Sequence, residues 1–553
     1  MESVSMGLSK KEIAILLIII AALSLIFKAY FLTLSIPVVS DTFGFVLNAI
    51  AYSHGDFALT PKQQPGWPLL IAPFLSPISS SHFIVYENVA RTLSLAVSTA
   101  TIVPTYLLAR KFFDEKYSLV AAALLAFEPH LNYWASSGFS EPLYNLVIIG
   151  SFYFILNKDT RSAYIAFLLA GILWWVRPNG IVMIIVVSIV YFINFRRSQR
   201  MVLKYAVCLA IFFAVISPIL IQRDIQYGDP LYVYYGESLF LGDYAKIGQE
   251  NVNSVDTGAL DYIHKNGLSH FISKFILGGT YHILNDTLKI SFPYLILLLP
   301  FGLIFSLRAV DQNKKYIAAN WTIVLAILAS LAIPYAVVQE YRFLFSLFPF
   351  LIIFATIPIQ RVIKYGFRTF TFSDKQKYLA MVIVLAIVFV MGALFVLRYE
   401  KMDRGEVKEE IEFAKFIENN LKGKLMDAGY NVAYLPYVNL EETPDGIKTY
   451  NINRGKLPFQ GFPYTTGNVT LTSIYGASVE DIVSSGEKYN LKYIAINQKG
   501  AVFFKFLDDI YDHEEKYPYL TKVYDSTEQG FKKFKVKVFE INYDKFHKLA
   551  IIG

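Results

Sequence analysis

The chain has 553 residues, of which 55% are hydrophobic and 17% are charged, and its formal net charge is +7. Soluble domains carry about 25% charged residues, so this composition excludes a single soluble globule, and it excludes a disordered chain as well. Residues 399–553 are about 28% charged, whereas residues 1–398 are only about 13% charged. The net charge divides into +9 for the first part and −2 for the second. We therefore expect a long apolar body followed by a soluble domain, and no nucleic-acid partner.

Long apolar runs predict a polytopic α-helical membrane protein. A span needs about 20 apolar residues, although short or interrupted spans occur. Eleven ranges fit, namely 12–34, 84–109, 117–133, 141–157, 162–176, 180–195, 202–221, 290–307, 317–338, 343–360 and 378–398. The first run exceeds the roughly 7–15 apolar residues of a signal peptide, so we predict that it is a retained membrane helix. The weaker run 67–78 contains three prolines, and we expect a re-entrant or interfacial segment there.

The basic residues give this arrangement a direction. With the N-terminus in the cytoplasm, every cytoplasmic connection carries lysine or arginine, beginning with Lys10 and Lys11, whereas the short outer connections carry few. Basic connections tend to stay in the cytoplasm. We therefore expect an integral protein of the plasma membrane, whose residues after 398 lie outside the cytoplasm.

Two long connections, 35–83 and 222–289, lie on the outer side in this topology. Loops of this length in a compact protein are usually functional. We divide the chain into a membrane-embedded part, 1–398, and a small extracytoplasmic α/β domain, 399–553. In the second part the patterns predict helices over 405–421 and 479–489 and strands over 491–497 and 535–542.

Two acidic residues at the predicted outer face are candidates for catalysis, because a charge at membrane depth is costly unless it is paired or hydrated. Asp41, in SDTFGFVLNA, could act as a general base towards a hydroxyl group or bind a cation. Alternatively, Ser40 or Asp41 begins a short helix as its cap. Glu141, in ASSGFSEPLYNL, could be a second active-site acid. Alternatively, it opens a helix after Ser140 and favours the helix dipole.

Arginines near the same face are candidate phosphate ligands. Arg342 follows Glu340 in QEYRFLFSLFPF, and its guanidinium could hold a phosphate through two hydrogen bonds. Alternatively, this segment is an interfacial anchor. Arg91 is a further phosphate candidate, with an ion pair to Glu87, four residues before it, as the structural alternative. Arg177, in WWVRPNG, lies at an outer turn that its proline and glycine explain without the arginine.

Three more polar residues lie near the predicted outer ends of helices. Lys28 lies near the end of the first helix and could simply extend its amine to the interface. Glu128 and His130 flank Pro129 at the end of the third helix. They either face the same pocket as the other candidates or form a satisfied buried pair.

Patterns of nucleotide and metal catalysis are absent from the sequence. The eight histidines show no HExxH or HxH spacing, and no Walker A, GxGxxG or GxSxG pattern occurs. These absences disfavour an ATP-driven pump and a cytosolic nucleotide-sugar enzyme.

Several short motifs occur in one order along residues 12–400. QPGWP at 64–68 looks like a PPxYP segment, VARTLS around Arg91 like an aRlxS stretch, SEPLY at 140–144 like a SEPLF-type segment, and EYRFLFSLFPF like an ERYxLPxxP segment. Together they resemble the GT-C superfamily of integral-membrane glycosyltransferases. The resemblance is to the branch of dolichyl-phosphate-mannose protein mannosyltransferases and aminoarabinose transferases.

This resemblance implies a glycosyltransferase with a polyprenyl- or dolichyl-phosphate sugar donor presented on the outer face. It implies Asp41 as the base that deprotonates the acceptor and Glu141 as a second active-site acid or part of a cation site. It also implies Arg342 as the donor-phosphate ligand, with Arg91 and Lys28 as further candidates. Supporting roles fall to Glu340, Arg177, Glu128 and His130. No cofactor is certain, and a divalent cation at Asp41 and Glu141 stays open.

The acceptor is a lipid-linked glycan, a protein hydroxyl or an envelope polymer, and a single base opposite a charged leaving group suits inversion of configuration. Protein mannosyltransferases commonly carry an Asp-Glu pair where this chain has Asp41-Thr42, and the WWDYG motif of oligosaccharyltransferases is absent. Two other classes stay open. A flippase of lipid-linked sugars would show inverted repeats, which we do not find, and a non-catalytic glycan-binding scaffold would not need Asp41. The tyrosine-rich loop 222–289 either shapes acceptor choice or lies on the membrane.

Overall fold

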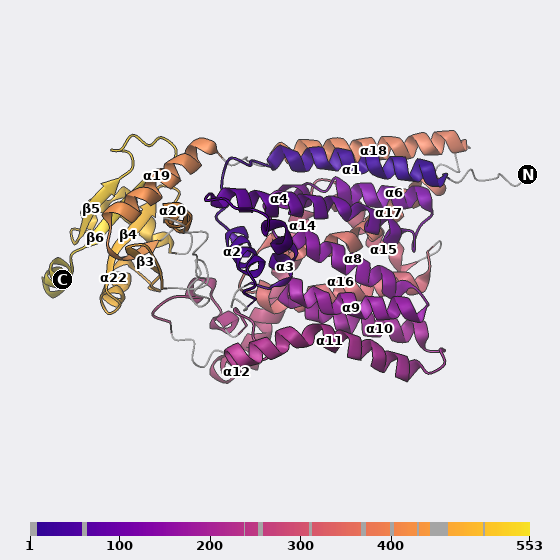
Figure 1. Ribbon diagram of the computed structural model, residues 1–553, viewed down its shortest axis with the longest axis horizontal. Coiled ribbons are helices and arrows are strands. Elements are labelled where there is room, and N and C mark those ends of the chain that lie inside the picture. The colour runs from indigo at the N-terminus through magenta and orange to yellow at the C-terminus, as the bar shows by residue number, and fades with distance from the viewer. Residues whose placement is uncertain are drawn as a thin grey trace, which may run out of the picture.

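The computed structural model of the chain describes residues 8–57, 63–236, 238–252, 258–308, 312–366, 372–398, 403–427, 431–442, 463–501 and 504–552. A bundle of long helices, called here the helical body, forms one part, and a small domain built on a β-sheet lies beyond one end of it (Figure 1). The N-terminus lies at the opposite end of the body from this C-terminal domain. The chain is thus a mostly helical membrane protein with a C-terminal domain built on a mixed sheet, and the boundary expected at residue 398 stays a prediction.

Seven helices in the described part of the chain are long and apolar enough to cross a membrane. They are α1 (Lys10–Phe31), α4 with α5 (Phe83–Ala100 and Ile102–Ala109), η1 with α10 (Pro178–Val182 and Met183–Phe195), α11 (Met201–Tyr227), α16 (Lys314–Tyr335), η5 with α17 (Tyr341–Leu347 and Phe348–Lys364) and α18 (Asp374–Val396). Exposed apolar side chains on α1 and α18, such as Ile18 and Leu394, suit contact with lipid.

The other four predicted spans hold shorter helices: α6 (Glu115–Ala126), α8 (Glu141–Leu156), α9 (Thr160–Val176) and α15 (Leu295–Leu307). Helix α6 is followed by α7 (Pro129–Ala135), because Pro129 cannot continue a helix and Glu128 caps the next one. These helices pack tightly. On α15, a Cβ at Gly302 would lie 2.2 Å from the backbone oxygen of Phe354 on α17, so the two helices touch through their backbones.

The two long connections contain helices of their own. The first connecting segment, 35–83, holds α2 (Asp41–Ser53) and α3 (Gly66–Leu75). The second, 222–289, holds η2 (Ser238–Leu241), η3 (Tyr244–Lys246), α12 (Ala259–Asn266), α13 (Leu268–Phe271), η4 (Ile272–Gly278) and all but the last residue of α14 (Gly279–Ile290). In Figure 1, α2, α3 and α12 lie at the end of the body that faces the C-terminal domain.

The C-terminal domain contains a six-stranded sheet in the order β2-β3-β1-β4-β6-β5. The strands are β1 (Gly423–Asp427), β2 (Tyr464–Thr466), β3 (Val469–Thr472), β4 (Leu491–Asn497), β5 (Leu520–Asp525) and β6 (Val536–Ile541), and the helices are α19 (Arg404–Asn420), α20 (Leu435–Glu442), α22 (Val479–Glu487), α23 (Asp508–Asp512) and α24 (Tyr543–Ile552). Strand β1 is parallel to β3 and β4, whereas β2, β5 and β6 pair antiparallel. Neighbouring residues such as Leu425 and Met426 enter different apolar clusters, as expected for alternate faces of a strand.

Helix α20 joins the C-terminal domain to the body. Leu440 lies in the apolar cluster of α2, α3 and α4, together with Phe43 and Phe83. The Glu441 carboxylate accepts from the amide of Phe83 and lies 3.0 Å from His82 Nδ1. The domain therefore rests directly on the helices that carry the first part of the candidate site.

Candidate active site

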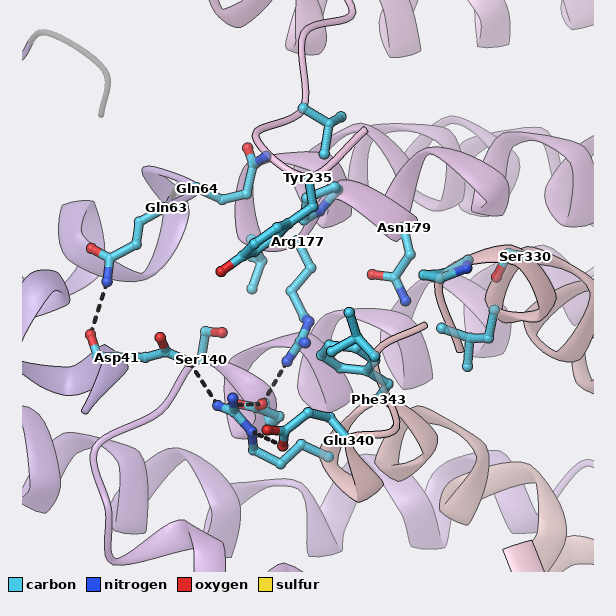
Figure 2. A pocket seen from close by; sticks show the side chains of 18 of the residues that line it. Asp41, Gln63, Gln64, Ser140, Arg177, Asn179, Tyr235, Ser330, Glu340 and Phe343 are labelled. Carbon is cyan, nitrogen blue, oxygen red and sulfur yellow. Dashed lines mark hydrogen bonds and ion pairs between the residues drawn. The ribbon is translucent and has the colours of Figure 1, made fainter. Parts of the chain in front are cut away.

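A cavity of about 540 Å³ brings together segments that are far apart in the chain (Figure 2). Its walls come from the start of α2, the turn before α3, the start of α8, the turn from α9 into η1, the end of α16 with η5, and the second connecting segment. The polar and aromatic lining residues include Asp41, Gln63, Gln64, Ser140, Glu141, Arg177, Asn179, Tyr235, Tyr244, Glu340 and Arg342. The volume is within the range of about 300–1,000 Å³ that is usual for ligand sites.

Arg342, in η5, lies at the centre of the charged cluster. Its Nη1 atom is 2.9 Å from Asp41 Oδ2 and 3.7 Å from Glu141 Oε1, and its Nε donates to Glu340 Oε2 at 3.3 Å. The Arg342 side chain is only 15% exposed, and the ring of Phe139 lies 4.8 Å from its guanidinium carbon. One guanidinium thus contacts three carboxylates in a partly desolvated place, where electrostatic interactions are stronger than in water.

Arg177 supplies the second positive charge of the cluster. Its Nη1 atom lies 2.6 Å from Glu141 Oε1, and the Glu141 side chain is 7% exposed. The Phe343 ring lies 5.4 Å from the Arg177 guanidinium carbon. Glu141 therefore lies between two arginines, and the cluster combines three carboxylates with two guanidinium groups.

The local sequence explains how Asp41 reaches this position. Asp41 is the first residue of α2, and the side chain of Ser40 makes no capping hydrogen bond to the helix. Gln63 Nε2 donates to the Asp41 carbonyl at 2.9 Å, and Asn48 Nδ2 donates to Gln63 Oε1 at 2.8 Å. A Cβ at Gly44 would lie 2.4 Å from Gln63 Nε2. The glycine therefore leaves the space through which Gln63 fixes the start of α2.

Glu141 is positioned by the start of α8. It is the first residue of that helix and is followed by Pro142, as its sequence predicts, but its carboxylate also pairs with Arg177. Glu141 therefore begins α8 and also lines the cavity, so its two interpretations are compatible. The nearby turn is fixed by Trp67, whose Nε1 donates to the Gly138 carbonyl at 2.8 Å.

Four predicted site residues lie apart from the residues that line the cavity. Arg91 donates to the carbonyls of Thr33, Ile36 and Ser136 at 2.8–3.1 Å, so it ties the first connecting segment to the turn after α7. Its predicted phosphate contact stays a prediction.

Lys28, Glu128 and His130 form a second polar group between α1 and α7. Lys28 Nζ donates to Asn132 Oδ1 at 2.8 Å and contacts Ser24. His130 Nδ1 lies 2.8 Å from Glu128 Oε1, and Glu128 also caps α7. This matches the interpretation of Glu128 and His130 as a buried polar pair.

The cavity also contains residues that the search for charges did not select. Gln63, Gln64, Asn179 and Tyr235 line it (Figure 2), and so does Tyr244. Burial, together with Tyr244 and the Asp41 carboxylate, raises the pKa of Tyr235, so its hydroxyl stays protonated at neutral pH. Gln63 precedes the QPGWP stretch, which Gln64 begins, and Asn179 follows Arg177-Pro178. A search for neutral polar residues beside these motifs could therefore have found them in the sequence.

The arrangement does not fit a divalent cation held by Asp41 and Glu141. Arg342 Nη1 lies within 4 Å of both carboxylates and already supplies positive charge between them. Among the described residues, no group of three or more His, Cys, Asp or Glu side chains could hold a metal ion. The cation therefore enters no step below.

Comparison with known protein families finds one match. Residues 68–221 match the family described as dolichyl-phosphate-mannose-protein mannosyltransferase. This segment contains Arg91, Glu141 and Arg177. No curated protein sequence matches the chain.

Solved structures share the fold. The Archaeoglobus fulgidus oligosaccharyltransferase, tethered to an acceptor peptide with the NVT sequon, is similar with 13% identity and a TM-score of 0.58, over 89% of this chain and 70% of that one. The same organism's AglB, in complex with an inhibitory peptide and a dolichol-phosphate, is 12% identical with a TM-score of 0.56. The likeness covers 93% of this chain and 73% of that one. ArnT from Cupriavidus metallidurans, bound to undecaprenyl phosphate, is 12% identical with a TM-score of 0.49. That likeness covers 95% of this chain and 97% of the other. These likenesses show a shared fold, and the match to the dolichyl-phosphate-mannose-protein mannosyltransferase family is confined to residues 68–221.

Proposed function

We propose that the cavity transfers a sugar from a polyprenyl- or dolichyl-phosphate donor to an acceptor hydroxyl with inversion of configuration. The observation that carries this proposal is the contact of 2.9 Å between Asp41 and Arg342. It brings a candidate base and a candidate phosphate ligand to one wall of a cavity of suitable size. The dolichol-phosphate in the AglB complex belongs to the chemical class of the lipid phosphate that this reaction would release.

Asp41 is the base in this mechanism. The acceptor oxygen attacks the anomeric carbon and forms the new glycosidic bond, while its proton passes to the Asp41 carboxylate. The bond from the anomeric carbon to the phosphate oxygen breaks, and its electron pair stays on the lipid phosphate. Because that phosphate leaves as an anion, the step needs no general acid.

Arg342 stabilises the negative charge that develops on the leaving phosphate. In the structure this guanidinium is paired with Asp41, so the donor phosphate competes with Asp41 for Arg342. Binding of the donor then releases the Asp41 carboxylate.

Glu141 and Arg177 have a positioning role in this proposal. Their contact of 2.6 Å sets the turn from α9 into η1, and Glu141 also keeps Arg342 on the cavity side at 3.7 Å. Gln63, Gln64 and Asn179 offer neutral amide groups that suit sugar hydroxyls. We assign Lys28, Arg91, Glu128 and His130 to the support of the surrounding helices.

The same proposal includes a topology. We propose eleven spans that follow the predicted ranges, a cytoplasmic N-terminus, and an extracytoplasmic location for the cavity and for residues 399–553, in the plasma membrane. The basic connections support this orientation. The acceptor is a glycan, a protein hydroxyl or an envelope polymer, with membrane lipids around the body.

A screen of radiolabelled polyprenyl-phosphate sugars tests the proposal. Purified protein in lipid nanodiscs is incubated with each donor and with membrane extract, and the anomeric configuration of the product is determined by NMR. We expect transfer from at least one donor, with a configuration opposite to that of the donor bond. Retention of configuration would contradict the single-displacement mechanism.

A further inference from the structure

The second connecting segment continues from the cavity onto the C-terminal domain. The cavity is lined by its residues Val233, Tyr235, Gly236, Leu239 and Tyr244. The next residues, 245–252, lie against the C-terminal sheet, and we call them the strap. One continuous stretch of chain therefore connects the wall of the cavity with a domain that contributes no lining residue among those described.

Glu250 is the main polar contact of the strap. Its amide donates to the Ser473 carbonyl at 2.9 Å, and its carboxylate accepts from Lys424 Nζ and Thr472 Oγ1. The Glu250 side chain is 12% exposed. Lys424 lies on β1 and Thr472 ends β3, so one carboxylate bridges two neighbouring strands. Hydrogen bonds that involve charged groups are about twice as strong as neutral ones.

Asn251 extends this pairing to the residue after β3. Its Nδ2 donates to the Tyr475 carbonyl, and its Oδ1 accepts from the Tyr475 amide, both at 2.8 Å. The side-chain amide thus pairs with Tyr475 as a neighbouring strand would. The Lys246 amine lies 5.1 Å from the centre of the Tyr475 ring, and Ala245 packs against an apolar cluster of the domain.

The domain also contacts the opposite wall of the cavity. Leu440 and Tyr437 on α20 pack against the helix cluster that includes Phe43 of α2, two residues after Asp41. The C-terminal domain therefore touches both the helix that begins at Asp41 and the segment that carries Tyr235. A rigid sheet domain held at two places can fix the separation of these walls.

We propose that the C-terminal domain positions the acceptor side of the active site through the strap, with Glu250 and Asn251 as positioning residues. The kinetic part of this inference rests on the proposed function. A lipid-linked donor is confined to the membrane, whereas the strap contacts the C-terminal domain, which lies beyond the end of the helical body (Figure 1). The wall that the strap holds therefore faces the acceptor.

Hydrogen–deuterium exchange of the full chain in nanodiscs tests the structural part without any substrate. Glu250→Gln keeps the size of the side chain but removes the charge that pairs with Lys424. Loss of one charge-assisted hydrogen bond increases local opening by about tenfold or more. We expect faster exchange over 233–252, where the Gly236 and Leu239 amides are hydrogen-bonded, and no change over α9. Unchanged exchange over 233–252 would overturn the proposal.

Glu487→Gln is the matched control. Glu487 pairs with His547 at 3.0 Å on the surface of the same domain, so its loss should leave residues 233–252 unchanged. Lys424→Met should reproduce the effect of Glu250→Gln, and the double variant should add little, because both changes break one contact. Additive effects would contradict a shared contact.

Kinetics separate a positioning role from a general loss of stability. With a donor found by the screen, Glu250→Gln should raise the KM for the acceptor about tenfold and leave the KM for the donor and kcat near wild type. Equal changes in both KM values, or none, would refute the acceptor role. Because exchange needs no turnover, failure of the proposed function would still leave the exchange result decisive for the strap.

Discussion

Asp41→Asn is expected to bind the lipid phosphate more tightly than the wild type, although it should transfer sugar poorly. The variant keeps the shape of the side chain and removes the charge that lies 2.9 Å from Arg342 Nη1. In the wild type, a phosphate must displace this carboxylate before it can bind the guanidinium. The variant does not carry that cost.

The size of the gain follows from the burial of the pair. The side chains of Asp41 and Arg342 are 25% and 15% exposed, so the pair is partly buried. Its interaction energy should lie between that of a surface ion pair, about 0–1 kcal/mol, and that of two charges in contact at an effective dielectric of 20, about 4 kcal/mol. We take about 1–2 kcal/mol, which corresponds to roughly five- to thirtyfold in affinity.

Binding of undecaprenyl phosphate to protein in nanodiscs, followed by microscale thermophoresis, measures this affinity. Glu340→Gln is the control, because Glu340 is 44% exposed and contacts the same guanidinium, so its removal should tighten binding less. Weaker binding by Asp41→Asn than by the wild type would refute the competition between Asp41 and the phosphate.

Three further predictions concern the cluster and the C-terminal domain. Arg342→Lys should weaken undecaprenyl phosphate binding about tenfold, because lysine lacks the planar guanidinium that pairs with two oxygens; titration calorimetry measures this. Glu141→Gln leaves Arg177 without its partner at 2.6 Å and should cost about 3 kcal/mol in the free energy of unfolding, seen as a lower melting temperature. Burial and the neighbouring Glu406 raise the pKa of Glu410 to about 7. The native state therefore favours the neutral carboxyl, stability falls as the pH rises from about 4.5 to 7, and Glu410→Gln should raise the melting temperature at pH 8 but not at pH 4.

Each of these has a defined contrary outcome. Undiminished affinity of Arg342→Lys would show that the fork of the guanidinium does not matter. For Glu141, the double variant with Arg177→Gln should be more stable than the single one, since no unpaired charge remains, and a further loss of stability would speak against the buried pair. A Glu410→Gln effect that is equal at both pH values would exclude titration as its cause.

The membrane helices were predictable because their signal is local. Each of the eleven apolar ranges holds a helix, and the basic residues at their ends needed no knowledge of tertiary contacts. For the four shorter helices, the apolar ranges did not predict the helix lengths. A proline at 129 breaks the run 117–133 into α6 and α7, and neighbouring helices cover the interrupted backbone.

Five of the nine predicted site residues line the cavity, but their geometry was not predictable. Asp41 and Arg342 are 301 residues apart in the chain, and no spacing rule connects them. Arg91 shows that a motif alone can mislead. The sequence around it resembles a ligand motif, whereas its guanidinium donates to three backbone carbonyls. Backbone acceptors leave no trace in the sequence. The contacts of Glu250 with Lys424 and Thr472 could not be foreseen because these residues are 174 and 222 positions away in the chain.

The rate of sugar transfer by Asp41→Asn with bound donor tests the central claim most directly. A single-turnover assay starts from the variant loaded with labelled donor, so that donor affinity does not enter the rate. We predict a rate about 10²–10⁴-fold below wild type, the usual contribution of a general base, from a variant that stays folded. A rate equal to that of the wild type would remove Asp41 from the mechanism.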